Sequence, residues 1–160
     1  MFRMKRLAAF IAILFTVAPA ARAATFTWSG ADGAAWNTTD TNWTPTTGAT
    51  PWDSTNGANS NAVFTNTSGS VNVTNTGVWL NGINDTASSG SFTIQGGPLN
   101  FVGSPTISAA GGTTLTLSGG ISATQNVTFV GNGIINVTTT PMNLGNAQIW
   151  VGNWNDTYPN

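Results

Sequence analysis

The sequence predicts an all-β protein, namely a right-handed parallel β-helix, or β-solenoid, that follows a signal peptide. Three observations support this prediction. Apolar and polar residues alternate with a period of two in short segments along the body of the chain. Almost no segment after Thr25 places apolar residues at helical spacing. Similar segments recur at short and nearly regular intervals, which is typical of solenoid coils. An antiparallel β-sandwich with similar strand spacing is the alternative fold.

Residues 1–23 have the parts of a secretory signal peptide. A basic start is followed by apolar and small residues from Leu7 to Val17, and Ala21-Arg22-Ala23 has the small-x-small pattern of a cleavage site. A membrane anchor is the alternative, but the apolar run is shorter than the ~20 residues that a spanning helix needs. We therefore expect a secreted or surface-located chain that begins at Ala24.

Charged side chains make up 6 % of the sequence, against roughly 25 % in an ordinary soluble protein. Every Lys and Arg lies in the predicted signal peptide, so Asp is the only charged residue type that follows it. The sequence has no His, Cys or Glu, which excludes the usual proton shuttles, thiol nucleophiles, zinc ligands and disulfides. The lack of cations argues against nucleic acid and anionic lipid as partners. We therefore predict that the chain is not an enzyme and binds no soluble cofactor.

Residues 24–60 form a Trp-rich region that we expect to cap the first coil. Trp28, Trp36 and Trp43 lie in a stretch rich in Gly and Asn, and Trp52 follows. The first coil of a solenoid has an apolar end that must be covered, and the large indole ring buries much area. The alternative is a carbohydrate-binding site, in which Trp28, Trp36 and Trp43 stack on sugar rings while neutral Asn and Thr side chains bond to hydroxyls. The two roles are compatible.

Residues 61–160 contain the coils, and their strands are predicted from alternation. Thr and Asn fill many of the alternate places, so one face of each strand is solvated and the other is buried. The predicted strands are Ala62–Thr65, Ser70–Thr74, Val78–Leu80, Ser91–Gln95, Leu99–Val102, Thr114–Leu117, Asn126–Val130 and Gly133–Val137. Each coil buries too few side chains to be stable alone, so stacking on its neighbours must stabilise it.

Self-comparison predicts how successive coils align. Two strand segments that are each followed by a Gly pair match one another, and their match aligns Phe92 with Leu115. By the same comparison, Val71 aligns with Phe92 over a slightly shorter interval, and Met142 aligns with Leu115 over a longer one. Unequal but similar intervals are expected where the loops between coils vary in length. These four residues are therefore predicted to stack.

Two motifs in the Trp-rich region resemble those of a known family. Thr27-Trp28-Ser29-Gly30 has the form Thr-Trp-x-Gly, and Asn42-Trp43 is an Asn-Trp pair. With the Gly-punctuated strands through Ile135, they resemble the N-terminal part of secreted bacterial proteins that carry autotransporter-associated β-strand repeats. This resemblance spans residues 25–150 and implies a parallel β-helix that is displayed at the cell surface or outer membrane and acts in adhesion. The family's Lys-preceded Gly-x-Gly-x-Leu-x-Leu repeat is missing from this sequence.

The C-terminal residues begin a further coil at Gln148-Ile149-Trp150, shortly before Asn160. We therefore expect the coils to be truncated at the C-terminus, so that the chain is the opening section of a longer passenger or comes from a shortened gene. An unclosed last coil exposes the backbone groups of its edge strands, which favours self-association.

Calcium is the metal that bare carboxylates suit best. Asp32 and Asp40, with Asp53 beyond them, lie among Asn and backbone carbonyl oxygens, which are typical calcium ligands. Each Asp also fits a turn, because Asp32-Gly33 is a turn pair and Asn84-Asp85-Thr86 lies between predicted strands. Asp32 and Asp40 are also the residues on which a remote alternative depends, an Asp-dependent hydrolase of neutral glycans.

Together these features predict an exported, non-enzymatic β-solenoid segment that presents a repetitive surface outside the cell, with adhesion as its use. A carbohydrate-binding module is the second prediction, and an Asp-dependent glycosidase is the third. Extracellular glycans and further copies of the chain are the expected partners.

Overall fold

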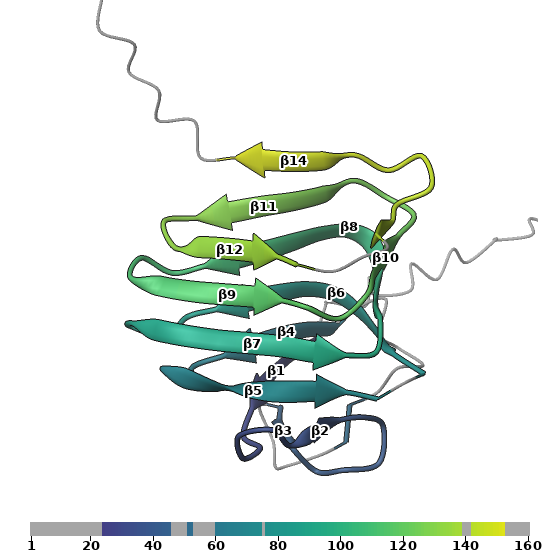
Figure 1. Ribbon diagram of the computed structural model, residues 1–160. Helices are drawn as coiled ribbons and strands as arrows, with labels where there is room; N and C mark the ends of the chain where they lie inside the picture. The colour runs from purple at the N-terminus through teal and green to yellow at the C-terminus, as the bar shows by residue number, and fades with distance from the viewer. Residues whose placement is uncertain (1–23, 46–50, 53–59, 75, 139–141, 153–160) are drawn as a thin grey trace, which may run out of the picture.

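The computed structural model describes residues 24–45, 51–52, 60–74, 76–138 and 142–152. In these residues the regular elements are all strands, and they stack into a β-solenoid of about four turns (Figure 1). No helix long and apolar enough to cross a membrane is found among them. The predicted signal peptide, Asp53 and residues 153–160 lie outside the described residues.

Fourteen strands occur in the described residues, and most are short. Their bounds are β1 (Ala24–Trp28), β2 (Ala35–Trp36), β3 (Trp43–Thr44), β4 (Ser60–Phe64), β5 (Ser68–Val73), β6 (Val78–Asp85), β7 (Gly90–Gly96), β8 (Leu99–Ala109), β9 (Thr113–Leu117), β10 (Ile121–Ala123), β11 (Val127–Gly131), β12 (Ile134–Val137), β13 (Met142–Asn143) and β14 (Ile149–Gly152).

Each full coil has three segments, which form three faces. In one coil, β7 forms the first face, and the long strand β8 supplies the second face with its first half and the third face with its second half. In the next coil these two halves are the separate strands β10 and β11, both of which pair with β8. The last coil repeats this arrangement with β12, β13 and β14.

The faces stack into two sheets. Among the described strands, the first faces form a five-stranded sheet in the order β12-β9-β7-β5-β2. The second and third faces form a nine-stranded sheet in the order β13-β10-β8-β6-β4-β1-β3, with β11 beside β8 and β14 beside β11. The strand pairs in both sheets are parallel except for β1 with β3. This pairing excludes the antiparallel β-sandwich.

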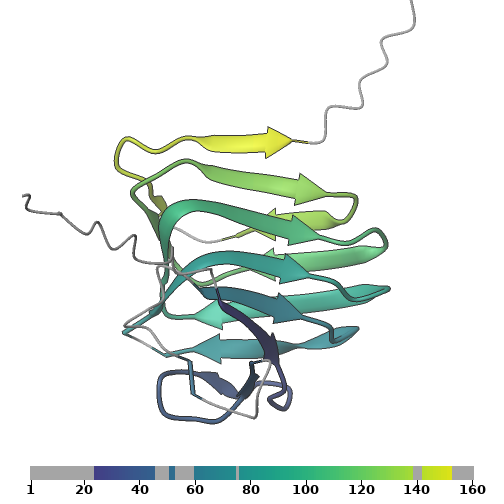
Figure 2. The ribbon, with the colours of Figure 1, turned by 180° about the vertical axis from the view of Figure 1, so that it is seen from behind.

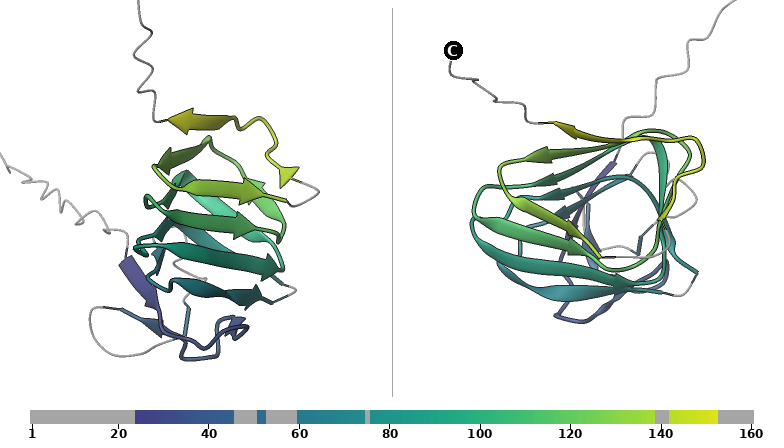
Figure 3. Two further views of the ribbon diagram at one scale, coloured as in Figure 1. Left: turned by 60° about the vertical axis from the view of Figure 1, so that its left-hand side comes forward. Right: turned by 45° about the horizontal axis from the view of Figure 1, so that its top comes forward.

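The coil is right-handed, as predicted. In Figure 1 the chain rises from β5 to β12 while the front strands run to the right. Seen from behind in Figure 2, the back strands also run to the right, so the chain keeps one sense of rotation as it rises. This is the hand that right-twisted parallel strands favour. The right-hand view of Figure 3 shows the coils surrounding a common interior.

Inward-pointing apolar side chains fill this interior in columns that run along the solenoid. The register between neighbouring strands gives each column one side chain from each coil. In three such columns every member is buried. The columns are Val71–Ile94–Leu117, Leu80–Phe101–Ala123 and Ile83–Ile107–Phe129. Because full burial of one such large apolar side chain contributes about 1.5–3 kcal/mol, stacking supplies the stability that a single coil lacks.

The predicted alignment of coils is correct at one position and wrong at another. Phe92 pairs with Leu115, as the self-comparison predicted. Val71 pairs with Ile94 instead of Phe92. The error is a slip of two residues, which alternation does not reveal because it keeps every side chain on the same face.

Two further predictions were wrong. Met142 stacks on Ile121 of the second face, not on Leu115 of the first. All three faces of a coil show the same alternation, so a residue of one face resembles a residue of another in the sequence. Strand β6 also continues through Asn84 and Asp85, where a turn between strands was predicted.

Candidate functional site

Four indoles fill the N-terminal end of the solenoid. Trp28, Trp36, Trp43 and Trp52 pack together with Phe64, and each indole is at most 3 % exposed. The ring centroids of Trp36 and Trp43 lie 4.7 Å apart, and those of Trp43 and Trp52 lie 4.8 Å apart. The indoles therefore seal the first coil, at the lower end of Figure 1, in the way expected of a cap.

This packing bears directly on the predicted sugar-binding residues. A sugar ring stacks on an exposed aromatic face, and Trp28, Trp36 and Trp43 present none. The Nε1 atoms of Trp36 and Trp43 are buried without a hydrogen-bond partner, whereas Nε1 of Trp52 donates to the backbone oxygen of Trp79 at 2.9 Å. A carbohydrate site on this structure must therefore use other side chains.

Asp32 and Asp40, the predicted calcium ligands, each bond to a different part of the fold. The Oδ1 atom of Asp32 accepts hydrogen bonds from the backbone N–H of Ser70 at 2.7 Å and from its hydroxyl at 2.9 Å. The Oδ2 atom of Asp40 accepts one from Nδ2 of Asn37 at 2.8 Å. The described part of the chain contains no group of three or more His, Cys, Asp or Glu that could hold a metal ion. The Asp32 carboxylate thus joins its turn to β5, and the Asp40 carboxylate bonds within its own loop. The turn predicted at Asp32-Gly33 is present.

Asp85 is a buried carboxylate at the end of β6, with 1 % of its surface exposed. Its Oδ1 atom accepts a hydrogen bond from the backbone N–H of Ala87 at 3.1 Å. Its backbone carbonyl accepts one from the N–H of Ala110 at 3.0 Å, in the next coil. Asp85 therefore stabilises a corner where two coils meet.

A polar groove of about 260 Å³ lies on the outer surface of the third face. Register places Gly82 between Asn61 and Thr106 on neighbouring strands, and atoms of these two neighbours close in on the place that a side chain would take. A Cβ on Gly82 would lie only 2.7 Å from the carbonyl oxygen of Thr106 and 2.9 Å from Oδ1 of Asn61. The lining of the groove is uncharged and mixed. Its polar residues are Thr25, Asn61, Asn84, Thr106 and Ser108, and its apolar residues are Val63 and Ile83.

Trp79 and Trp150 are exposed aromatic residues that the sequence analysis did not single out. Their exposed fractions are 49 % and 56 %. Trp79 aligns with Asn100 on the next strand, so it stands at the start of a polar row on the second face. The sequence did contain a signal for this position, because Trp79 alternates with Val78 and Leu80, and both of these are buried.

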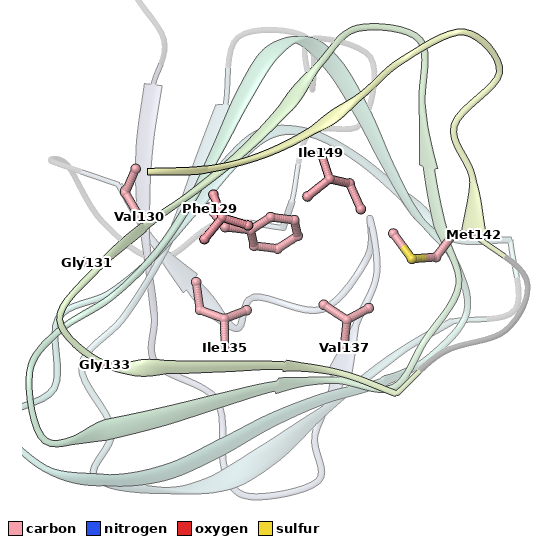
Figure 4. A pocket seen from close by; sticks show the side chains of 9 residues that line it. Phe129, Val130, Gly131, Gly133, Ile135, Val137, Met142 and Ile149 are labelled. Carbon is pink, nitrogen blue, oxygen red and sulfur yellow. The ribbon is translucent and has the colours of Figure 1, made fainter. Parts of the chain in front are cut away.

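The C-terminal end of the described coils, called the open end below, exposes apolar side chains. A cavity of about 480 Å³ opens there between strands of the last two coils. Figure 4 shows Phe129, Ile135, Val137, Met142 and Ile149 around the space inside the last coil. The structure thus has one end filled by indoles and one end at which the apolar interior meets solvent.

These features define the class of the protein as a β-solenoid, whose described coils are filled by indoles at one end and expose apolar side chains at the other. The chain matches no family model, and no curated protein or solved structure matches it. The resemblance to proteins with autotransporter-associated β-strand repeats therefore stays a prediction from the sequence motifs.

Proposed function

We propose that the chain is an exported, non-enzymatic β-solenoid segment that presents a repetitive, uncharged surface outside the cell and serves in adhesion. The observation that best supports this proposal is a row of uncharged side chains on the second face, one Trp followed by three polar residues. Trp79, Asn100, Ser122 and Asn143 follow one another in register on four successive coils. Neighbouring strands repeat at about 4.8 Å, so the row offers hydrogen-bonding groups at regular intervals.

The charge distribution indicates what kind of surface such a row contacts. The described residues contain no Lys, Arg or His, and Asp32, Asp40 and Asp85 are the acids among them. Each of these carboxylates already accepts a hydrogen bond within the fold. Contacts made by the outer rows are therefore neutral hydrogen bonds and van der Waals contacts, which salt screens little.

Adhesion of beads that carry the full chain to a neutral polysaccharide layer, such as dextran, tests this proposal. We expect retention that is equal at low and high salt. The triple variant Asn100→Asp/Ser122→Asp/Asn143→Asp should lose it, because the charges disrupt the neutral row. A control with Thr93→Asp and Thr116→Asp on the first face should be retained. No retention of the native chain, or equal loss in the control, contradicts the proposal.

The polar groove favours a second candidate function, the binding of a neutral saccharide. Asn61, Thr106 and Ser108 supply amide and hydroxyl groups, and Gly82 lets Asn61 and Thr106 of the neighbouring strands come close together. The hydroxyl of Ser108 donates to Oδ1 of Asn84 at 2.6 Å, which holds both side chains in place beside the groove. This site would replace the buried Trp28, Trp36 and Trp43 of the sequence prediction.

Calorimetric titration of the full chain with neutral oligosaccharides tests the groove. Asn61→Ala and Thr106→Val should each weaken binding about tenfold, which corresponds to about 1.4 kcal/mol and to the loss of one or two hydrogen bonds. Thr93→Val on the first face is the control and should bind like the native chain. Equal affinity of the native chain and the Asn61→Ala variant, or no heat with any oligosaccharide, excludes this function.

A further inference from the structure

The open end exposes apolar side chains that lie inside the solenoid everywhere else. Ile149 and Val151 of β14 are 41 % and 71 % exposed, and both line the cavity of about 480 Å³. Phe129, Ile135 and Val137 form its inner wall (Figure 4). A contiguous apolar surface that ends in a cavity marks a place where another apolar surface binds.

We propose that a second copy of the chain covers this end, so that two solenoids join open end to open end about a two-fold axis. The sealed end of the molecule supports this orientation. There Trp36, Trp43 and Trp52 already fill the first coil. Strand β3 also lies antiparallel to β1 and terminates the larger sheet. In the described residues, side chains of the chain itself therefore already fill the N-terminal end, whereas the open end has a cavity that a partner can fill.

The edge strands support the two-fold arrangement as well. Strands β12, β13 and β14 pair with β9, β10 and β11 of the preceding coil, and they are the last strands of their faces in the described chain. Across a two-fold axis perpendicular to the solenoid, each edge strand meets a strand that runs antiparallel to it. Antiparallel edges can form a hydrogen-bonded ladder, so both sheets continue through the interface.

The charge of this half of the molecule permits such close contact. No described residue from Thr86 onward is charged, so two copies that meet here experience no like-charge repulsion from these residues. The flexible side chain of Met142, at the rim of the cavity, can adapt to the facing surface.

Sedimentation of the full chain over a range of concentrations tests the proposal. We expect the mass of two chains for the native protein and a dimer dissociation constant at least 100-fold higher for Ile149→Asp and for Val151→Asp. Trp79→Asp replaces an equally exposed apolar side chain on a lateral face, and this control should remain dimeric. Far-UV circular dichroism checks that all three variants keep the native strand content.

Three outcomes would overturn the proposal. The first is a native chain that is monomeric at every concentration. The second is an open series of larger assemblies in place of a closed dimer. The third is a dimer that neither Asp substitution weakens. A variant that ends at Gly152 tests for another occupant of the open end. If the full chain is monomeric and the shortened chain dimerises, residues 153–160 are that occupant.

Discussion

Replacing Trp43 with Ala should remove the centre of the aromatic cap. Trp43 has no exposed surface, and its ring centroid lies 4.7 Å from that of Trp36, 4.8 Å from Trp52, 5.1 Å from Trp28 and 5.7 Å from Phe64. Truncation of a buried Trp costs about 3–5 kcal/mol, because transfer free energy is lost and a cavity remains. The change also removes a buried N–H without a partner, which favours the lower end of this range.

The loss of stability can be measured by urea unfolding that is monitored by far-UV circular dichroism. This signal does not depend on the fluorescence of the Trp that is removed. A loss of about 3 kcal/mol, with a denaturant slope of about 2 kcal/mol/M, lowers the unfolding midpoint by roughly 1.5 M. Trp43→Phe is the matched control. It keeps an aromatic ring in the cluster and removes the unpartnered N–H, so we expect a cost of about 1 kcal/mol.

The cap would be of little importance to stability if Trp43→Ala lowered the free energy of unfolding by less than about 1 kcal/mol. Equal losses in the Ala and Phe variants would contradict the role assigned to ring packing, because the Phe variant preserves most of it.

Three further predictions follow from the corners, the exposed aromatics and the carboxylates. Gly90→Ala should lower the free energy of unfolding, measured by calorimetry, by about 2 kcal/mol or more, because φ is 99° and a Cβ would collide with a carbonyl of the neighbouring coil. Gly33→Ala is the control and should lower it by about 1 kcal/mol, because φ is 71° there but the space around it is open. Equal costs would contradict the close approach of the coils at Gly90. Acrylamide should quench emission that Trp79→Phe removes, while Trp36→Phe should leave the amount of quenchable emission unchanged, because Trp36 is buried. The reverse result would contradict the exposure of Trp79 and the burial of Trp36. Asp32→Ala should lower stability by about 1 kcal/mol with or without calcium, since the Asp32 carboxylate bonds to β5, and a calcium-dependent loss would show that it binds the ion.

Local patterns in the sequence were sufficient to predict the class of fold and eight of the strands, but not β1, β10 or the second half of β8. Alternation places Val78 and Leu80 inside and Trp79 outside, and it does so within three residues. Register depends instead on residues more than twenty positions apart, such as Val71 and Ile94. A two-residue slip preserves alternation, so the sequence alone did not distinguish the observed pairing from its neighbour.

The candidate sites were harder to predict because they depend on this register. The groove is lined by Asn61, Asn84 and Thr106, which lie on three neighbouring strands and meet only because the coils stack. The clustered tryptophans fitted either a cap or a sugar site, since composition does not show what covers a ring. Phe64, from a later strand, is one of the residues that packs against Trp28 and Trp43 and buries them.

The stacking of coils in this register can be tested directly with cysteine pairs, because the chain has no Cys of its own. Thr93 and Thr116 are register partners on β7 and β9, while Thr114 is offset from Thr93 by two residues. Neighbouring strands lie about 4.8 Å apart, which a disulfide can bridge, whereas the offset pair is separated by roughly 8 Å, which it cannot. Mild oxidation followed by mass spectrometry should therefore yield an intramolecular disulfide in Thr93→Cys/Thr116→Cys and free thiols in Thr93→Cys/Thr114→Cys. Free thiols in the first variant, or a disulfide in the second alone, would contradict the solenoid register described above.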